Sequence, residues 1–277
     1  MQLSCAVPHV AQRFSWDCGL ACVEMVLRAL GDETSPAKLH AQAGTASVWT
    51  IDLAFLLAAH CVPCTYRTSQ LGCNPNFARE GFYAERLRDD RERVERLFSR
   101  ALASGTPCVE HRAVSRDELC LHLGGGSAVA IVLVDRQRLC GTEDGAAERG
   151  NAHASEGAHA AGDRPAGAAA ATGRLLVQTL GTLVPSALRP SSGAQPASDA
   201  PRLAAGGVGG FTGHYLVLVG VSTDSPAYLA LDPARERGPV AVPFAELDRA
   251  RGAFGTDDDV LLVCDERLPK QIVTQSP

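Results

Sequence analysis

The pattern of apolar and polar positions along the chain predicts both helices and strands. From Cys22 to Leu30 apolar residues recur at helical spacing, and Gly31 then ends the pattern. Asp17 stands where the N-cap of this helix belongs, so Cys18 is expected in its first turn. Periodicity and end signals predict further helices over residues 36–43, 51–60, 89–103, 115–123 and 243–251. Thr50 is the expected N-cap of the second of these, and Ser115 to Glu118 form a capping box.

Apolar runs of strand length occur in both halves of the chain. They predict strands over residues 62–68, 108–112, 127–135, 214–220, 228–232 and 260–264. Helices that come early, strands that come late and a single core predict an α+β fold, in which the N-terminal helix packs on an antiparallel sheet.

The composition changes abruptly at Gly141. From there to Gly210 the chain is rich in Ala, Gly, Ser and Pro, apart from an apolar run at 174–180. Such a segment cannot bury a core, so we expect a disordered insertion over 141–210 within a single domain covering 1–277.

Charge and apolar content exclude several classes of function. The net charge is −5 and no dense cluster of Lys and Arg is present, which argues against nucleic-acid binding. No apolar stretch reaches the roughly 18 residues that span a membrane, and the N-terminus does not have the pattern of a signal peptide. A protein of the cytoplasm, or of both the cytoplasm and the nucleus, is therefore expected. Its ten cysteines are then interpreted as reduced thiols.

The candidate chemistry begins at Cys18. The unpaired backbone N–H groups of a helix start favour a thiolate over a thiol. A thiol nucleophile needs a base, and the base needs a residue that orients it. His214 opens one apolar run and Asp232 closes the next, so an antiparallel hairpin would place the two side by side. Gln12 is expected to point a side-chain N–H at an oxyanion formed beside Cys18.

This order of residues resembles that of papain-like thiol hydrolases, and within them the bacteriocin-processing peptidases, where the last member is Asp before Pro. The resemblance implies a papain-like cysteine-peptidase fold and a site of Cys18, His214, Asp232 and Gln12 acting on a peptide or other acyl bond. It implies no cofactor and no metal. The remaining histidines outside the insertion lack both a following strand and a carboxylate at hairpin distance: His9, His40, His60, His111 and His122.

A second resemblance covers almost the whole chain. Six stretches carry it, in this order: VPHV at 7–10, WDCGLAC at 16–22, VWTIDL at 48–53, GFY at 81–83, RVERLF at 93–98 and FGTDDDVL at 254–261. In them the chain resembles the guanylyl cyclase domain-containing protein family, which includes plant proteins described as soluble guanylyl cyclases. This resemblance implies conversion of GTP to cyclic GMP with Mg²⁺ or Mn²⁺.

Three functional hypotheses stay open at this point. For a thiol hydrolase the partner is a peptide or protein substrate, and for a cyclase it is GTP. The compact acidic cluster that could hold cyclase metals is Asp257 to Asp259, although acidic residues ahead of a strand commonly form a solvated turn. The third hypothesis is a non-enzymatic binding protein on the same fold. Cys61 and Cys64 form a CxxC pair, which we interpret as two small buried residues rather than half of a zinc site.

Overall fold

The computed structural model describes residues 2–74, 81–139, 211–236 and 238–273. The described elements belong to one compact unit, Met1–Thr142 with Leu203–Pro277. The predicted insertion at 141–210 lies outside the described residues.

The predicted helices are all present. Their bounds are α1 (Cys18–Ala29), α2 (Pro36–Ala43), α3 (Thr50–Ala59), α4 (Gly81–Ser104), α5 (Arg116–Gly124) and α7 (Phe244–Arg251), with a short 3₁₀ turn η2 at Arg136–Arg138. Helix α4 begins eight residues before its predicted start at 89. The added stretch 81–88 contains Ala, Glu, Leu and Arg, which are good helix formers, but no clear apolar period.

The sheet contains more strands than predicted. The strands are β1 (Gln2–Cys5), β2 (Cys64–Thr68), β3 (Cys108–His111), β4 (Ala128–Asp135), β5 (Gly213–Val221), β6 (Ala227–Leu231), β7 (Val240–Pro243), β8 (Val260–Cys264) and β9 (Lys270–Val273). The sequence did not predict β1, β7 and β9. Each has four residues, which is too short for a period of two to stand out.

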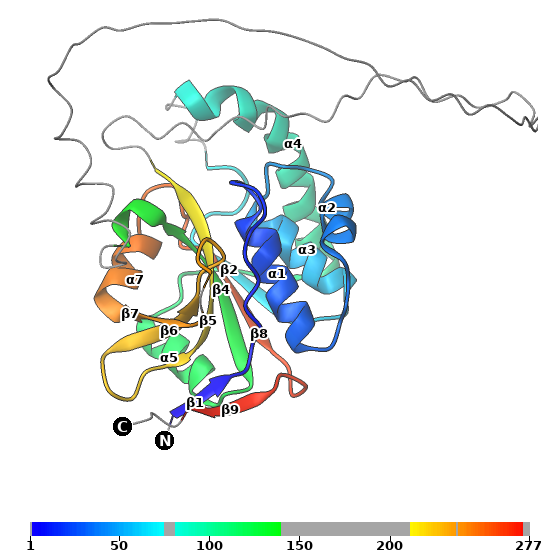
Figure 1. Ribbon diagram of the computed structural model, residues 1–277. Coiled ribbons are helices and arrows are strands. Elements are labelled where there is room, and N and C mark those ends of the chain that lie inside the picture. Colours follow the sequence, from blue (N-terminus) through cyan, green and yellow to red (C-terminus); the bar gives the residue numbers. More distant parts are fainter. Residues whose placement is uncertain (1, 75–80, 140–210, 237, 274–277) are drawn as a thin grey trace, which may run out of the picture. The chain divides into compact units, whose positions relative to one another are not determined.

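Most strand pairs are antiparallel, in the order β3-β2-β8-β4-β5-β1-β9, while β6 pairs with β5 and β7 pairs with β6. The pair β2–β3 is parallel. Helices α1 and α3 lie on one side of the sheet and α5 and α7 on the other (Figure 1). The predicted α+β class and the packing of α1 against the sheet are confirmed, whereas the papain-like fold stays a prediction.

Two covered faces explain why the central strands read as continuous apolar runs. Along β4, Val129 and Ile131 pack into the core that contains α1 and α3. Ala130 and Val132 pack into the second core, with α5 and α7. Both sets are fully buried, so neither face of this strand carries polar residues to mark an alternation.

The predicted cap of α3 was wrong, while that of α5 is confirmed. Trp49 is the N-cap of α3, and its backbone N–H donates to Asp52 Oδ2 at 2.8 Å. Thr50 is the first helical residue, and its side chain is buried. The Ser115 and Glu118 capping box closes with reciprocal bonds of 3.0 and 3.2 Å.

The two ends of the insertion leave the sheet side by side. Strands β4 and β5 are antiparallel neighbours whose last described pair is Asp135 with Gly213. Arg136 N then donates to Thr212 O at 2.9 Å. A long stretch of chain therefore connects two adjacent points.

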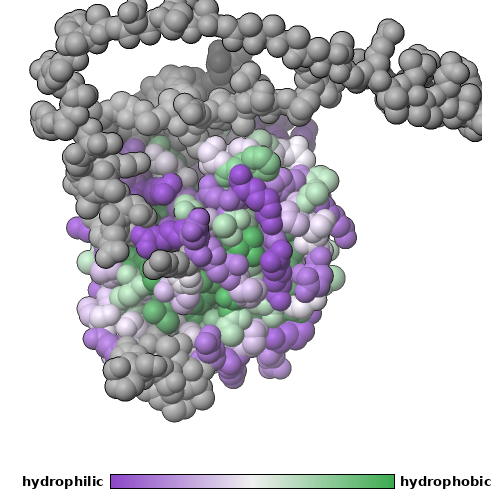
Figure 2. Space-filling model, viewed as in Figure 1, coloured by the Kyte–Doolittle hydropathy of each residue, from purple (hydrophilic) through white to green (hydrophobic). Residues whose placement is uncertain are grey.

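Polar and apolar side chains are interspersed on the face of the unit shown in Figure 2. Among the described residues, no helix combines the length and the apolar character needed to cross a membrane.

Candidate thiol site

The fold places Cys18 at the first residue of α1, as predicted, with a residue exposure of 7%. Asp17 is the N-cap residue, but its side chain does not cap the helix. Its carboxylate instead turns back and accepts the backbone N–H groups of Arg13 and Phe14, at 3.1 and 2.9 Å. The N–H groups of the first helical turn consequently receive no hydrogen bond from the side chain of the N-cap residue.

The β5–β6 hairpin joins the two other predicted members of the site. His214 lies near the start of β5, and Asp232 follows directly after β6. His214 Nε2 donates to Asp232 Oδ1 at 2.7 Å, as the hairpin predicted. Both residues are buried, with exposures of 4% and 8%.

The pair is arranged as an imidazolium and a carboxylate. Burial alone would lower the pKa of His214, but the hydrogen bonds to Asp232 and Cys18 raise it to about 9. Burial alone would raise the pKa of Asp232, but the hydrogen bond from His214, together with the His214 charge, the Ala234 N–H and nearby Arg136, holds it below its usual range. At neutral pH the two groups therefore carry opposite charges.

Cys18 is the second side-chain partner of His214. Because Nε2 is occupied by Asp232, Nδ1 is the ring nitrogen left for the thiol. Cys22, one turn further along α1, is completely buried, and burial raises the pKa of its thiol well above the usual value. Of these two cysteines on one helix, only Cys18 meets a base.

Gln12 lies next to this group of residues through its backbone. Gln12 N donates to Pro233 O at 2.7 Å, directly after Asp232. Its side-chain Nε2 donates to Phe14 O at 2.8 Å, and among the described residues its buried Oε1 has no hydrogen-bond partner. The Gln12 amide therefore supports the loop before Cys18. The predicted oxyanion role of Gln12 stays a prediction.

The sequence did not point to two residues that support Asp232. His9 Nε2 donates to Asp232 O at 2.9 Å. Arg235 Nε lies 3.7 Å from Asp232 Oδ2. The sequence indicates these two residues only by their nearness to predicted site residues. His9 precedes Gln12 by three residues, and Arg235 follows Asp232 by three.

The acidic stretch begins with a turn at Asp257 and Asp258, as interpreted, but it is not solvated, since these two residues are half-buried and Asp259 is buried. Asp257 Oδ1 accepts from Asn74 Nδ2 at 2.9 Å, and Asp258 forms an ion pair with Arg251 at 3.2 Å. Asp259 is buried and accepts from a hydroxyl group. The three carboxylates thus have separate partners, which does not fit a shared site for Mg²⁺ or Mn²⁺. In the described part of the chain, no group of three or more His, Cys, Asp or Glu side chains is arranged to hold a metal ion.

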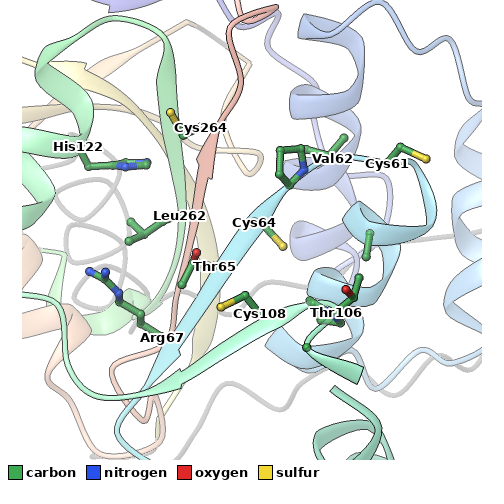
Figure 3. Close-up of a pocket in the computed structure, with 14 residues that line it drawn as sticks. Cys61, Val62, Cys64, Thr65, Arg67, Thr106, Cys108, His122, Leu262 and Cys264 are labelled. Carbon is green, nitrogen blue, oxygen red and sulfur yellow. The ribbon is translucent and has the colours of Figure 1, made fainter. Parts of the chain in front are cut away.

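The CxxC pair lies at the junction of α3 and β2, beside a groove of about 770 Å³. Figure 3 shows the sulfur atoms of Cys61 and Cys64 pointing in different directions. Cys61 is exposed and Cys64 is half-buried, so the prediction that both are buried was wrong for Cys61. Cys108 and Cys264 also line this groove, whereas Cys18 is not among its described lining residues.

Comparison with known proteins gives one consistent result. The guanylylate cyclase family model matches residues 7–159 and 198–263, which include all four candidate site residues. Guanylyl cyclase 1 of Arabidopsis thaliana is 33% identical over 266 residues, covering 96% of this chain and 78% of that protein.

Proposed function

This chain belongs to the guanylylate cyclase family, and we propose that it carries a cysteine-dependent hydrolytic site acting on a peptide or other acyl bond. The observation that supports this proposal most is the position of His214, which bonds Asp232 through Nε2 and has Cys18 as its other partner. A nucleophile, a base and an orienting carboxylate in this sequence of contacts form an arrangement suited to covalent catalysis.

In the proposed reaction, the proton of the Cys18 thiol already lies on His214 before substrate binds, so the resting site is a thiolate beside an imidazolium. The thiolate attacks the carbonyl carbon of the substrate, and the electron pair of the C=O bond moves to oxygen. The N–H groups at the start of α1 would stabilise that oxyanion, together with the side-chain amide of Gln12.

Collapse of this intermediate breaks the C–N bond, and the leaving amine takes the proton from His214. Water then attacks the thioester while His214 accepts a proton from it. The second intermediate then breaks its C–S bond, the acid product leaves, and the Cys18 thiolate and the His214 imidazolium are restored. Asp232 stays ionised throughout and stabilises the charged imidazole.

The test compares the pH dependence of alkylation at each cysteine. Iodoacetamide is a suitable probe because it is small, and Cys18 is nearly covered by its neighbours. In the wild-type protein we expect Cys18 to be alkylated at a lower pH than the exposed Cys61, Cys108 and Cys264, because the helix start and the neighbouring imidazolium favour its thiolate. Peptide mass spectrometry separates the sites.

Variants at the base decide the assignment. His214→Ala should move the Cys18 profile upward by one unit or more, and Asp232→Asn should move it less, because the imidazole remains. His122→Ala, at a histidine bonded to Val129 O, is the matched control and should change nothing. An unchanged Cys18 profile in folded His214→Ala would disprove the proposal. A shifted profile together with no cleavage of any amide in a peptide library would instead favour a binding protein.

The family name supports a second candidate function, the formation of cyclic GMP from GTP. The direct assay incubates the protein with GTP and Mn²⁺ or Mg²⁺ and measures cyclic GMP by mass spectrometry. Product that survives Cys18→Ser but is lost in a folded Asp257→Asn, Asp258→Asn double variant would favour the cyclase over the hydrolase.

A further inference from the structure

A chain of hydroxyl groups connects a buried carboxyl group to the rear of the thiol site. Asp259 Oδ2 accepts from Thr50 Oγ1 at 2.5 Å. Thr50 Oγ1 lies 2.8 Å from Tyr215 Oη, and all three residues are buried. These residues come from the turn before β8, the start of α3 and β5, so the chain joins three separate elements.

The Tyr215 end of this chain touches both halves of the site. Tyr215 follows His214 on β5. Its ring also packs against Gly19, where an added Cβ would lie 3.0 Å from Tyr215 Cδ2. Gly19 follows Cys18, so the Tyr215 ring lies against the start of α1, while its backbone continues directly from His214.

The carboxyl group at the other end lacks a counter-charge. In the described part of the chain, Asp259 forms no ion pair, and its buried Oδ1 has no hydrogen-bond partner. The groups that face it are Thr50 from α3, Tyr66 and Thr68 from β2, and the neighbouring carboxylate of Asp257. Burial raises the pKa of Asp259 to about 7, and the hydrogen bond from Thr50 offsets this rise only partly.

We infer that Asp259 is a positioning residue for Cys18 and His214, acting through the hydroxyl groups of Thr50 and Tyr215. This inference rests on the proposed thiol site and adds a residue to it. An uncharged carboxylic acid can accept a hydrogen bond from Thr50 on one oxygen and keep a proton on the other. It can therefore fix the hydroxyl groups of Thr50 and Tyr215 in place without leaving a buried charge. The acidic stretch that suggested a metal site would then serve the cysteine instead.

The test measures the rate of Cys18 alkylation by iodoacetamide between pH 5 and 9.5. Asp259→Ala and Tyr215→Phe should each slow the reaction about tenfold at pH 7. Asp259→Asn keeps a carbonyl oxygen for Thr50 and should stay within about twofold of the wild type. Both substitutions interrupt the same series of hydrogen bonds. Alkylation of Cys18 in the double variant Asp259→Ala, Tyr215→Phe should therefore be no slower than in the slower single variant.

A matched control separates positioning from general loss of stability. Asp90 is another buried acid that accepts from a hydroxyl group, that of Ser47, but it lies at the α3–α4 contact. Asp90→Ala should lower the melting temperature without slowing Cys18. If Asp259→Ala does not fold, Tyr215→Phe decides, since it removes only one oxygen.

The outcomes distinguish this inference from the function on which it rests. Unchanged Cys18 rates in folded Tyr215→Phe and Asp259→Ala, or losses that add in the double variant, would overturn the role of Asp259. If His214→Ala still shifts the profile, the thiol site survives that result. If His214→Ala shifts nothing, the thiol site itself fails.

Discussion

His214 has two neighbours that favour its charged form, inside an interior that opposes charge. The bond to Asp232 is short, at 2.7 Å, and Cys18 lies on the other side of the ring. Without these partners, burial would keep the imidazole neutral. The residues of the site therefore depend on one another for their protonation states, and removing one changes the others.

This dependence predicts how stability changes with pH. The pKa of His214 is raised from about 6.5 to about 9 in the folded protein, so its contribution to stability is complete below pH 6.5 and is lost as the pH rises through 9. Urea unfolding should show a loss of roughly 3 kcal/mol between pH 6.5 and 9.5 that His214→Gln does not show. Exposed His111 provides the control, since His111→Gln should lose as much as the wild type. Equal losses in all three proteins would refute a charged His214.

The order of residues in the sequence sufficed to predict the positions of Cys18 at a helix start and of His214 beside Asp232, because each is tied to the start or the end of an apolar segment. Their catalytic role stays a prediction. Side-chain directions could not be predicted in that way. Asp17 caps the preceding loop rather than α1, and Asp259 turns inward, because backbone N–H groups and hydroxyls from distant segments happen to surround them. Such partners depend on tertiary structure, on which local patterns carry no information.

At the scale of elements, the loop before α1 is fixed by several specific side-chain contacts. Asp17 accepts two backbone N–H groups there, and His40 of α2 lies 3.3 Å from Asp17 Oδ2. Phe14 and Trp16 stack with ring centroids 5.7 Å apart. The loop therefore holds the position of Cys18 from its N-terminal side.

The substitution Asp17→Ala should show whether the loop before α1 positions Cys18. The substitution leaves two backbone N–H groups without an acceptor and should destabilise the protein by about 2 kcal/mol and slow Cys18 alkylation. Ser35 caps α2 in the ordinary way, so Ser35→Ala should cost about 1 kcal/mol and leave Cys18 unaffected. Thermal unfolding and alkylation rates measure the two effects. Equal alkylation rates in both variants would mean that the loop does not position Cys18.

Element lengths decided which parts of the sheet could be predicted. Long runs such as β4 and β5 were recognised, while the four-residue strands β1 and β9 depend on pairing with each other. The partner of each lies at the opposite end of the sequence. A window of neighbouring residues cannot detect such a pairing.

At the scale of the molecule, one long segment connects adjacent points of the sheet. Arg136 N and Thr212 O are hydrogen-bonded where the chain leaves β4 and returns to β5. The register of β4 and β5 is set by the strands themselves, over paired positions from Ala130 to Asp135. The described unit therefore does not need a long connection at this point.

Replacing residues 141–206 with a short Gly and Ser linker should leave the described unit folded. Loop-closure entropy changes slowly with length, so the free energy of unfolding should change by only about 1–2 kcal/mol. Thermal unfolding tests this, and the Cys18 alkylation profile tests whether the site persists. A collapse of the melting temperature would show that the removed segment contributes to the core.

The same connection divides the site between two stretches of sequence. Gln12 and Cys18 come before it, and His214 and Asp232 come after it. A protease cut within the connection would give two fragments, each with half of the reactive groups, joined through the β4–β5 ladder. Neither fragment contains both the sulfur and its base, so two halves expressed separately would restore a reactive thiol only on reassociation. Alkylation of Cys18 would then report fragment complementation.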